Sequence, residues 1–465
     1  MSFDAAIIGG GISGLATAEE LRRRGRSVVL LERQVAAGGK AFSERLGGFL
    51  MEHGPSTVGA HVAAATDWSQ RLELETERCE LGPAVRRRYL VAGGRLEGMA
   101  SHPFSLLSSG YLSLPARLRL LAEVVLPRGR EGDDESVAQF ARRRFGREVA
   151  ERLVDPLVGG IYAGRADEIS LRAAFPALHE LERQYRSVVL GVAARRWRGG
   201  RMPGGRLFSW RHGVASLPRA LQRNLGQALR TGIAVQGLER GRRGFRLLTP
   251  EGELEARAVV IATQPHMTAA LIEKLDPTAA EAAAGVAAPS LAVVYLGYRR
   301  QQVEHALDGL GFLAAADEGR ALNGAQFCST MFSHRAPAGH VALAAYFGGA
   351  RNPDLGLLPA DDLVALARRE FGDLVGARGE PVLARVRHWP RGLPQYAAGH
   401  VERVRDLAAL PQRLPGLFLT GNYFRGPSVA ACLELADETA ARLDGFLAGL
   451  GESSDRAPIK AAASR

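Results

Sequence analysis

The chain has 465 residues, 46% of them hydrophobic, so it can bury a large core, and we expect two or three domains. Its 60 basic and 49 acidic residues give a net charge of +11, which suits an anionic ligand or surface, although an arginine-rich solvated surface would give the same balance. The three cysteines lack metal-ligand or disulfide spacing, so we expect no metal site. The basic clusters lack interleaved aromatic residues, so we expect no nucleic-acid partner. No run of ~18 uninterrupted apolar residues occurs, so we expect no membrane span.

The first predicted element is a buried strand that leads into a glycine-rich turn and a helix. Residues 5–8 are apolar, Gly9, Gly11 and Gly14 have G-x-G-x-x-G spacing, and residues 15–21 repeat with a helical period. In such a turn Gly9 permits the sharp bend, Gly11 lets the backbone approach a pyrophosphate, and Gly14 lets the helix pack on the strand. Because the helix N-terminus presents free N–H groups to phosphates, the pattern predicts a dinucleotide site, with a structural glycine-rich turn as the alternative.

A second strand over residues 27–31 ends in Glu32, where an acid accepts the ribose hydroxyls of an adenine dinucleotide. Gly38, Gly39 and Lys40 follow closely. A second glycine pair just past the acid is typical of FAD enzymes of the glutathione-reductase type, whereas a nicotinamide dehydrogenase would continue its βαβ alternation. We therefore expect FAD rather than NAD.

The middle of the chain has a different pattern. Residues 86–91 are strand-like, and Ser136 is an acceptable N-cap for a helix. Residues 155–164 are apolar and glycine-rich, so we expect an irregular segment that either packs in a core or lines a ligand cavity. The elements expected next are a helix over residues 170–181 that bends or begins at Pro176, a mobile loop over residues 194–206, and a helix over residues 219–227 with Ser216 as its N-cap.

Strands dominate the second half. Residues 256–263 form an apolar strand that ends in Ala262 and Thr263, which indicates a return to the dinucleotide fold. The other strand-like segments are residues 233–238, 245–252, 291–298, 312–313, 326–332 and 341–347, of which the last four predict an antiparallel sheet. The chain then predicts a helix over residues 360–371, a strand entering a glycine turn over residues 417–423, a long helix over residues 429–450 and a disordered tail from residue 452.

These elements predict an α/β fold, with a Rossmann-type FAD-binding domain of the glutathione-reductase type, an inserted α+β substrate domain and a helical region at the active-site or membrane rim. We expect the FAD-binding domain to be assembled from residues 1–85, 226–285 and 401–451, and the substrate domain from residues 86–225 and 286–400. Residues 452–465 form the tail.

Several blocks of the chain together resemble the protoporphyrinogen/coproporphyrinogen oxidase family of the flavin amine-oxidase superfamily. The likeness extends over nearly the whole chain and is carried most specifically by residues 155–164 and residues 394–400. Further matching blocks are residues 9–15 with Glu32 and residues 38–40, residues 170 and 175–176, residues 208–218, residues 333–337, Trp389, and residues 415–426.

The resemblance implies non-covalent FAD, with Val235 on the adenine side, Trp389 near the flavin, and the start of the last helix near its pyrimidine end. Where the family prefers Gly-Val, this chain has Pro427 and Ser428, which removes an N–H donor close to the flavin. Motif and resemblance together predict these cofactor-binding residues: Gly9, Gly10, Gly11, Ile12, Ser13, Gly14, Glu32, Arg33, Gly39, Lys40, Gly54, Pro55, Ser56, Thr57, Val235, Ala262, Thr263, Trp389, Gly421, Asn422, Pro427, Ser428 and Val429.

The family's substrate is a flexible tetrapyrrole that carries propionates, so the resemblance implies a porphyrinogen oxidase of haem biosynthesis that removes hydride from methylene bridges, usually with oxygen as acceptor. Arg88 matches an arginine placed against a propionate, with a solvated surface arginine as the alternative. Gly160 and Tyr162 complete the predicted substrate-binding residues. The motifs require no general base, so we assign no catalytic residue.

Two other functions stay open: another FAD oxidoreductase on the same scaffold, such as an amine oxidase or a carotenoid desaturase, and a weakly catalytic carrier of a tetrapyrrole or FAD. The first strand starts by residue 5, which leaves no room for a signal or transit peptide, so we expect a cytoplasmic location. The basic balance and the apolar residues 100–126 predict peripheral membrane contact, with an ordinary packed helical region as the alternative.

Overall fold

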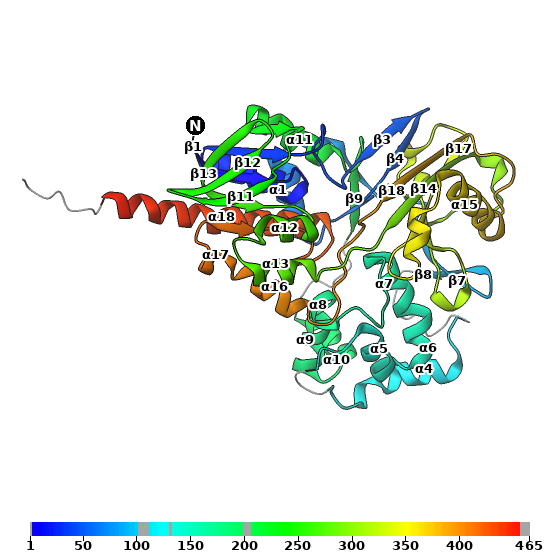
Figure 1. The fold of residues 1–465 in the computed structure, drawn as a ribbon. Helices are drawn as coiled ribbons and strands as arrows, with labels where there is room; N and C mark the ends of the chain where they lie inside the picture. Colours follow the sequence, from blue (N-terminus) through cyan, green and yellow to red (C-terminus); the bar gives the residue numbers. More distant parts are fainter. Residues whose placement is uncertain (1, 101–110, 130–132, 199–205, 456–465) are drawn as a thin grey trace, which may run out of the picture.

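The protein has an α/β fold built on two sheets. The computed structural model describes residues 2–100, 111–129, 133–198 and 206–455 (Figure 1). Within these residues the first sheet has seven strands, in the order β10-β2-β1-β13-β12-β11, with β19 also paired to β13. Their bounds are β1 (Ser2–Ile8), β2 (Val28–Glu32), β10 (Leu229–Thr231), β11 (Gly237–Gly241), β12 (Gly244–Thr249), β13 (Gly252–Ile261) and β19 (Leu417–Leu419).

The parallel part of this sheet brings together strands that lie far apart in the chain. β1 pairs with β2 and β13, and β13 pairs with β19, all in parallel. In this register Ile261 lies opposite both Ile8 and Leu419, so β1, β13 and β19 end at the same level. Their carboxyl ends form one edge, which is the edge where open α/β sheets bind ligands.

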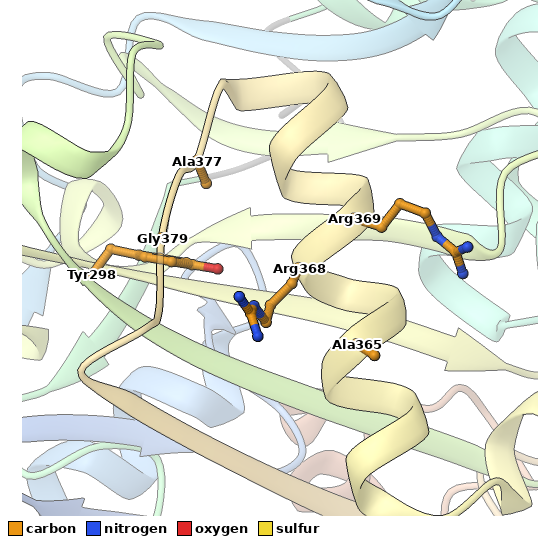
Figure 2. A pocket seen from close by; sticks show the side chains of 6 residues that line it. All are labelled: Tyr298, Ala365, Arg368, Arg369, Ala377 and Gly379. Atoms are coloured by element: carbon orange, nitrogen blue, oxygen red, sulfur yellow. The ribbon is translucent and has the colours of Figure 1, made fainter.

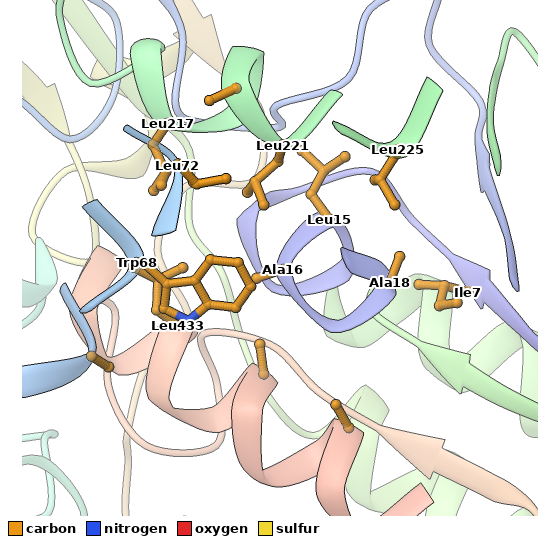
Figure 3. Close-up of a cluster of buried hydrophobic side chains, with 14 of the residues drawn as sticks. Ile7, Leu15, Ala16, Ala18, Trp68, Leu72, Leu217, Leu221, Leu225 and Leu433 are labelled. Atoms are coloured by element: carbon orange, nitrogen blue, oxygen red, sulfur yellow. The ribbon is translucent and has the colours of Figure 1, made fainter. Parts of the chain in front are cut away.

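Helices cover both faces of the first sheet. On one face α1 (Ile12–Arg23), α2 (Ala63–Arg71), α11 (Ser216–Leu225) and α18 (Val429–Asp455) share a core (Figure 3). Figure 3 shows Leu15 and Ala16 of α1 close to Leu221 and Trp68, the latter being fully buried. On the other face lie α12 (Pro265–Ile272), α13 (Pro277–Ala284), α16 (His400–Ala408) and α17 (Leu410–Arg413).

The second sheet is mixed and has the order β18-β14-β17-β16-β15-β7-β8. Its strands are β7 (Arg87–Ala92), β8 (Arg95–Ala100), β14 (Leu291–Arg299), β15 (Gly309–Leu313), β16 (Leu322–Phe327), β17 (His340–Gly348) and β18 (Leu383–Trp389). α15 (Ala360–Val375) packs on one face, and β4 (Phe49–Glu52), the partner of β3 (Ser43–Leu46), packs on the other. β5 (Val58–Gly59), β9 (Leu207–Trp210) and β6 (Arg78–Glu80) form a small third sheet.

A group of helices lies below the second sheet in Figure 1. Its members are α4 (Leu114–Leu121), α5 (Val137–Phe145), α6 (Arg147–Val149), α7 (Asp155–Tyr162), α8 (Leu171–Ala174), α9 (Pro176–Tyr185) and α10 (Val188–Trp197). The predicted cap at Ser136 is confirmed, because Ser136 and Gln139 form a capping box, and α9 does begin at Pro176. Among the described residues, no helix combines the length and apolar character needed to cross a bilayer.

The expectation of an irregular segment at residues 155–164 is wrong, since α7 spans most of it. Pro156 sits in the first turn, where its missing N–H leaves no hydrogen bond unmade. A Cβ at Gly159 would lie 3.2 Å from the Arg351 guanidinium, and one at Gly160 would lie 2.8 Å from Leu313. The two glycines therefore serve close packing against the second sheet rather than an irregular backbone.

Other boundaries also differ from expectation. Residues 194–197 continue α10 instead of forming a loop, while residues 199–205 lie outside the described part. Ser216 is not the N-cap of α11, because the cap is Ala215 and the Ser216 hydroxyl donates to Glu77 at 3.2 Å. Residues 233–236 are not in a strand, residues 328–331 form the helical turn α14 (Cys328–Met331), and residues 452–455 belong to α18. Of the predicted disordered tail, residues 456–465 lie outside the described residues.

Candidate cofactor and substrate site

The glycine-rich turn and the turn before the last helix follow two strands that lie on either side of β13. Gly9 follows β1, Ala262 follows β13 and Thr420 follows β19. Adjacent strands are ~4.8 Å apart, so the turns after β1 and β19 lie within about 10 Å of each other. Ser13 of α1 lies beside the Cys432 thiol of α18 and helps to set its pKa, so the two helices that leave these turns meet there.

Three glycines of the first turn serve different structural purposes. Gly9 has φ +106°, and its Cβ would lie 2.9 Å from the carbonyl oxygen of Ala262. A Cβ on Gly14 would lie 2.0 Å from the carbonyl oxygen of Gly9, so only glycine lets α1 pack this closely on β1. A Cβ on Gly11 would meet no atom of the described residues within 4 Å, so the space at the start of α1 is open there. A phosphate can therefore approach the N–H groups of this helix end.

The Glu32 carboxylate stands beside this turn at the end of β2. It accepts the backbone N–H of Gly10 at 2.6 Å and that of Gln34 at 2.8 Å. Arg33 is exposed, with Nη1 3.9 Å from the Met267 sulfur. Val235 packs against the core on the far side of the sheet from α1.

Lys40 supplies a cation to the same edge. Burial lowers the pKa of Lys40 to about 8. The ammonium lies near the Cys432 thiol, whose own pKa burial raises to about 11, and near His266, whose pKa it helps to lower. A Cβ on Gly54 would lie 2.0 Å from the carbonyl oxygen of Lys40, so Gly54 packs directly against Lys40. A partly buried cation that has no carboxylate partner in the described part of the chain, next to open space at a helix N-terminus, fits the pyrophosphate of a dinucleotide.

A buried ion pair holds the segment that contains Gly54, Pro55, Ser56 and Thr57. Arg335 is fully buried, and its Nη2 donates to Glu52 at 2.9 Å and to the carbonyl oxygen of Ser56 at 2.9 Å. The other two nitrogens of Arg335 have no hydrogen-bond partner among the described residues. Sequence reasoning did not single out Arg335 as a site residue, although it lies in a block that carries the family resemblance.

The second sheet turns one face toward this segment. Trp389 of β18 donates its indole N–H to the carbonyl oxygen of His53 at 2.6 Å, and the Arg387 guanidinium lies 4.5 Å from the Trp389 ring centre. Tyr346 packs on the same face, and Gln326 is in register with Ala344 there, with an Oε1 that lacks a partner among the described residues. Tyr346 and Gln326 were missed, because strand alternation gives the period of a strand but not which face meets the site.

The predicted substrate residues lie at the other end of this sheet. Arg88 is exposed on β7 and forms no ion pair among the described residues, whereas Arg87 lies 3.7 Å from Asp308. Leu313 of β15 pairs with Leu90 of β7 and contacts Gly160, so β15 connects Arg88 to α7. Tyr162 is buried, its hydroxyl donates to the carbonyl oxygen of Ala174 at 2.9 Å, and its ring packs against Phe175 and Tyr396.

The closing turn leads into the long helix α18. Gly421 has φ +145°, and the carbonyl oxygen of Asn422 accepts the Tyr396 hydroxyl at 2.7 Å. Pro427 and Ser428 precede α18, and the Ser428 hydroxyl accepts the backbone N–H of Ala431 at 3.1 Å. The positive end of the α18 dipole therefore faces the edge where the strands end. Thr263, next to Ala262, contacts the Thr268 hydroxyl at 3.0 Å.

Two surface hollows lie away from this site. One of about 310 Å³ is lined by Tyr298, Ala365, Arg368, Arg369, Ala377 and Gly379 (Figure 2). Figure 2 shows Arg368 of α15 directed toward the Tyr298 hydroxyl. The other, of about 350 Å³, lies at Glu318–Arg320 and the α15 residues that face them. Both are on the α15 side of the second sheet and contain no predicted site residue.

Comparisons with known proteins agree with this arrangement. Residues 12–443 match the family model described as flavin containing amine oxidoreductase. The chain is 30% identical to the chloroplastic protoporphyrinogen oxidase of Nicotiana tabacum, over 96% of this chain and 86% of that protein. It is 28% identical to the coproporphyrinogen III oxidase of Bacillus subtilis, over 92% of this chain and 95% of that protein.

The fold is also found in solved structures. A crystal structure from Exiguobacterium sp. 255-15 matches 96% of this chain and 99% of its own chain with a TM-score of 0.83 at 23% identity, which shows the shared fold. The family match over nearly the whole chain, the two relatives and the glycine turns at one sheet edge lead to the same assignment. The chain belongs to the flavin containing amine oxidoreductase family and, within it, to the protoporphyrinogen/coproporphyrinogen oxidases.

Proposed function

We propose that this protein is an FAD-dependent oxidase that converts a porphyrinogen, either protoporphyrinogen IX or coproporphyrinogen III, to the porphyrin in haem biosynthesis. The observation that carries the proposal is the near-full-length likeness to oxidases of both porphyrinogens. The edge shared by β1, β13 and β19 supports the proposal, because FAD needs a binding site for its pyrophosphate and a binding site for its flavin ring close to each other.

FAD is held non-covalently in this proposal. The α1 N-terminus and Lys40 bind the pyrophosphate, and Glu32 accepts the ribose hydroxyls. The segment at Gly54 and the turn at Asn422 flank the ring. Cys432 is a poor candidate for a covalent flavin link, since it is buried in α18 and burial raises the pKa of its thiol to about 11.

We further propose the domain division expected from the sequence. The strands of the first sheet come from residues 2–32, 229–261 and 417–419, which supports an FAD-binding domain assembled from three pieces. The strands of the second sheet come from residues 87–100 and 291–389, which supports an inserted substrate domain.

The chain's own residues bind and orient the substrate and the cofactor, and they exclude water from the site. Arg88 binds a substrate propionate through its forked donors, and Gly160 and Tyr162 line the substrate side. Bound FAD supplies the hydride acceptor for the methylene bridges, and oxygen is the proposed final acceptor. In this proposal the α18 N-terminus would stabilise negative charge on the reduced flavin through the helix dipole. No side chain is required to remove a proton as a general base.

Anaerobic mixing with protoporphyrinogen and coproporphyrinogen in parallel tests the proposal. We expect a yellow purified protein whose flavin absorbance is bleached by one of the two, with porphyrin fluorescence appearing in step. A yellow protein that ignores both but is bleached by amines or polyenes would instead be another oxidoreductase of this scaffold. A colourless protein that binds porphyrin would be a carrier.

Peripheral membrane contact is a second, separate proposal. Of the apolar residues that prompted it, Tyr111 and Leu112 are buried, whereas Leu114, Leu118 and Leu121 of α4 are exposed. Phe104, Leu106 and Leu107 lie outside the described residues. An exposed apolar helix face beside arginines can dock on an anionic bilayer.

A further inference from the structure

Two adjacent residues connect the candidate substrate helix to the candidate flavin turn. Gln395 is 8% exposed, and its Nε2 donates to the carbonyl oxygen of Tyr162, the last residue of α7, at 2.9 Å. Tyr396 is 1% exposed, and its hydroxyl donates to the carbonyl oxygen of Asn422 at 2.7 Å. A single peptide unit therefore separates the contact to α7 from the contact to the turn after β19.

The Gln395 side chain is fixed in one orientation. Its amide nitrogen donates a second hydrogen bond to the carbonyl oxygen of Leu393 at 3.1 Å, so both N–H hydrogens are used. Its backbone N–H donates to the carbonyl oxygen of Ala287 at 2.8 Å. A Cβ on Gly164 would lie 2.5 Å from its Oε1, so glycine at that position leaves room for the amide.

Tyr396 is held by aromatic neighbours on both sides. Its ring stacks on His400, with centroids 4.2 Å apart, and lies 5.4 Å from the Tyr162 ring. Burial lowers the pKa of His400 to about 4, so the imidazole is neutral and its Nε2–H donates to the carbonyl oxygen of Tyr423 at 2.8 Å. Two successive carbonyl groups of the turn, those of Asn422 and Tyr423, thus accept hydrogen bonds from residues 396 and 400.

These donors matter because the turn begins with Gly421. A glycine at φ +145° brings no side chain to pack, so the orientation of the following peptide groups depends on their hydrogen bonds. Removing one donor frees one carbonyl without creating a cavity. The change is therefore confined to the geometry of the turn.

We propose that Gln395 and Tyr396 are positioning residues that set the spacing between the substrate and the flavin ring. The inference rests on the proposed function. Gln395 acts on the substrate through α7, and Tyr396 acts on the cofactor through the turn at Asn422. Neither side chain touches the reacting atoms, and their effects are separable, since each side chain is hydrogen-bonded to only one of the two elements.

The test uses the intact flavoprotein and two conservative variants, Gln395→Leu and Tyr396→Phe. Gln302→Leu is a matched control, because the Gln302 amide also donates to two backbone carbonyl oxygens, those of Arg378 and Glu380, away from the site. Tyr298→Phe controls for loss of the hydroxyl of a buried tyrosine on the opposite face of the second sheet, where that hydroxyl borders a surface hollow. The measurements are the FAD dissociation constant of the apoprotein, the flavin absorption spectrum, and KM and kcat for the active porphyrinogen.

We expect Tyr396→Phe to raise the FAD dissociation constant about three- to tenfold and to shift the flavin absorption bands, with KM within about twofold. Gln395→Leu is expected to raise KM about three- to tenfold with the FAD dissociation constant within about twofold. Both controls are expected to match the unmodified protein in every measurement.

Equal changes of KM and FAD affinity in both variants would indicate a general loosening and would overturn the proposal, as would variants that match their controls. If Tyr396→Phe does not accumulate as folded protein, His400→Leu withdraws the neighbouring donor from Tyr423 and is judged by the same FAD criterion. A protein that binds FAD but oxidises no porphyrinogen contradicts the proposed function alone, because the FAD measurements still decide the role of Tyr396.

Discussion

FAD affinity should depend measurably on pH, because the proposed pyrophosphate site contains the ammonium group of Lys40. Burial lowers the pKa of Lys40 to about 8 in the protein without its cofactor. A bound pyrophosphate favours the charged ammonium, so its pKa is higher in the complex. Below pH 8 the ammonium is charged in both states, and FAD affinity should not depend on this group. Above pH 8 the apoprotein has lost the proton that the complex retains, so affinity must fall as pH rises.

The size of the effect follows from a single linked proton. With a pKa of about 8 in the apoprotein and a clearly higher one in the complex, the apparent dissociation constant scales as one plus the ratio of neutral to charged Lys40. Between pH 7 and pH 9 this gives a weakening of about tenfold. Titrating the apoprotein with FAD at constant ionic strength, with quenching of flavin fluorescence as the signal, measures it directly.

A pair of variants isolates the lysine. Lys40→Met should bind FAD more weakly at pH 7 and lose most of the pH dependence, whereas Lys274→Met, which removes a lysine between α12 and α13, should behave like the unmodified protein. A flat affinity between pH 7 and pH 9 in the unmodified protein would refute the reasoning. So would a Lys40→Met variant that keeps the tenfold change.

Three further outcomes are expected. Gly11→Ala should change the free energy of unfolding of the apoprotein by less than about 1 kcal/mol, because φ is −73° and no atom of the described residues lies within 4 Å of the new methyl, yet it should weaken FAD binding more than tenfold. Gly445→Ala in α18, where the described residues also leave open space, is the control, and unchanged FAD affinity in Gly11→Ala would contradict the pyrophosphate position. Arg88→Ala should raise KM for the porphyrinogen about tenfold and leave FAD affinity intact, while the control Arg87→Ala should change KM less than twofold. Steady-state kinetics measures both variants, and an unchanged KM in Arg88→Ala would mean that Arg88 is only a solvated surface residue. In vesicle flotation the protein should rise with anionic but not neutral liposomes, less so at high salt, and Leu118→Glu should reduce the floated fraction; absence of salt-sensitive binding removes the membrane proposal.

The glycine-rich turn was predictable because its cause is local. Gly9, Gly11 and Gly14, spaced in this way between a strand and a helix, are enough to predict a turn of this kind without any long-range contact. The structure confirms the strand, turn and helix and places Glu32 beside Gly10. The pairing of β13 with both β1 and β19 is a long-range fact, and the sequence indicated it only through small residues at the ends of apolar strands.

The α7 helix was missed for the opposite reason. A proline and a pair of glycines within a few residues normally interrupt a helix, and no local feature of the sequence indicates a helix here. The contacts that favour glycine at residues 159 and 160 come from Arg351 and Leu313, more than a hundred positions away. Likewise, β14 and β17 are apolar on both faces because α15 covers one face and β4 the other, so their sequences could not show which side faces the cofactor.

The links between the two sheets explain why a cofactor on one sheet can serve a substrate on the other. Phe49 and Met51 of β4 pack on the second sheet, and the Tyr295 hydroxyl of that sheet donates to the carbonyl oxygen of Leu50 at 2.9 Å. The Glu52–Arg335 pair adds a buried charge contact at the end of the same strand. Such a pair contributes little net stability, but losing one partner leaves a buried charge and is strongly unfavourable, so it resists any sliding of β4. Since β4 leads directly into the segment at Gly54, these contacts hold that segment against the second sheet, on which the proposed substrate residue Arg88 lies. Hydride transfer needs precise placement, because misplacement by about 1 Å costs roughly a hundredfold in rate.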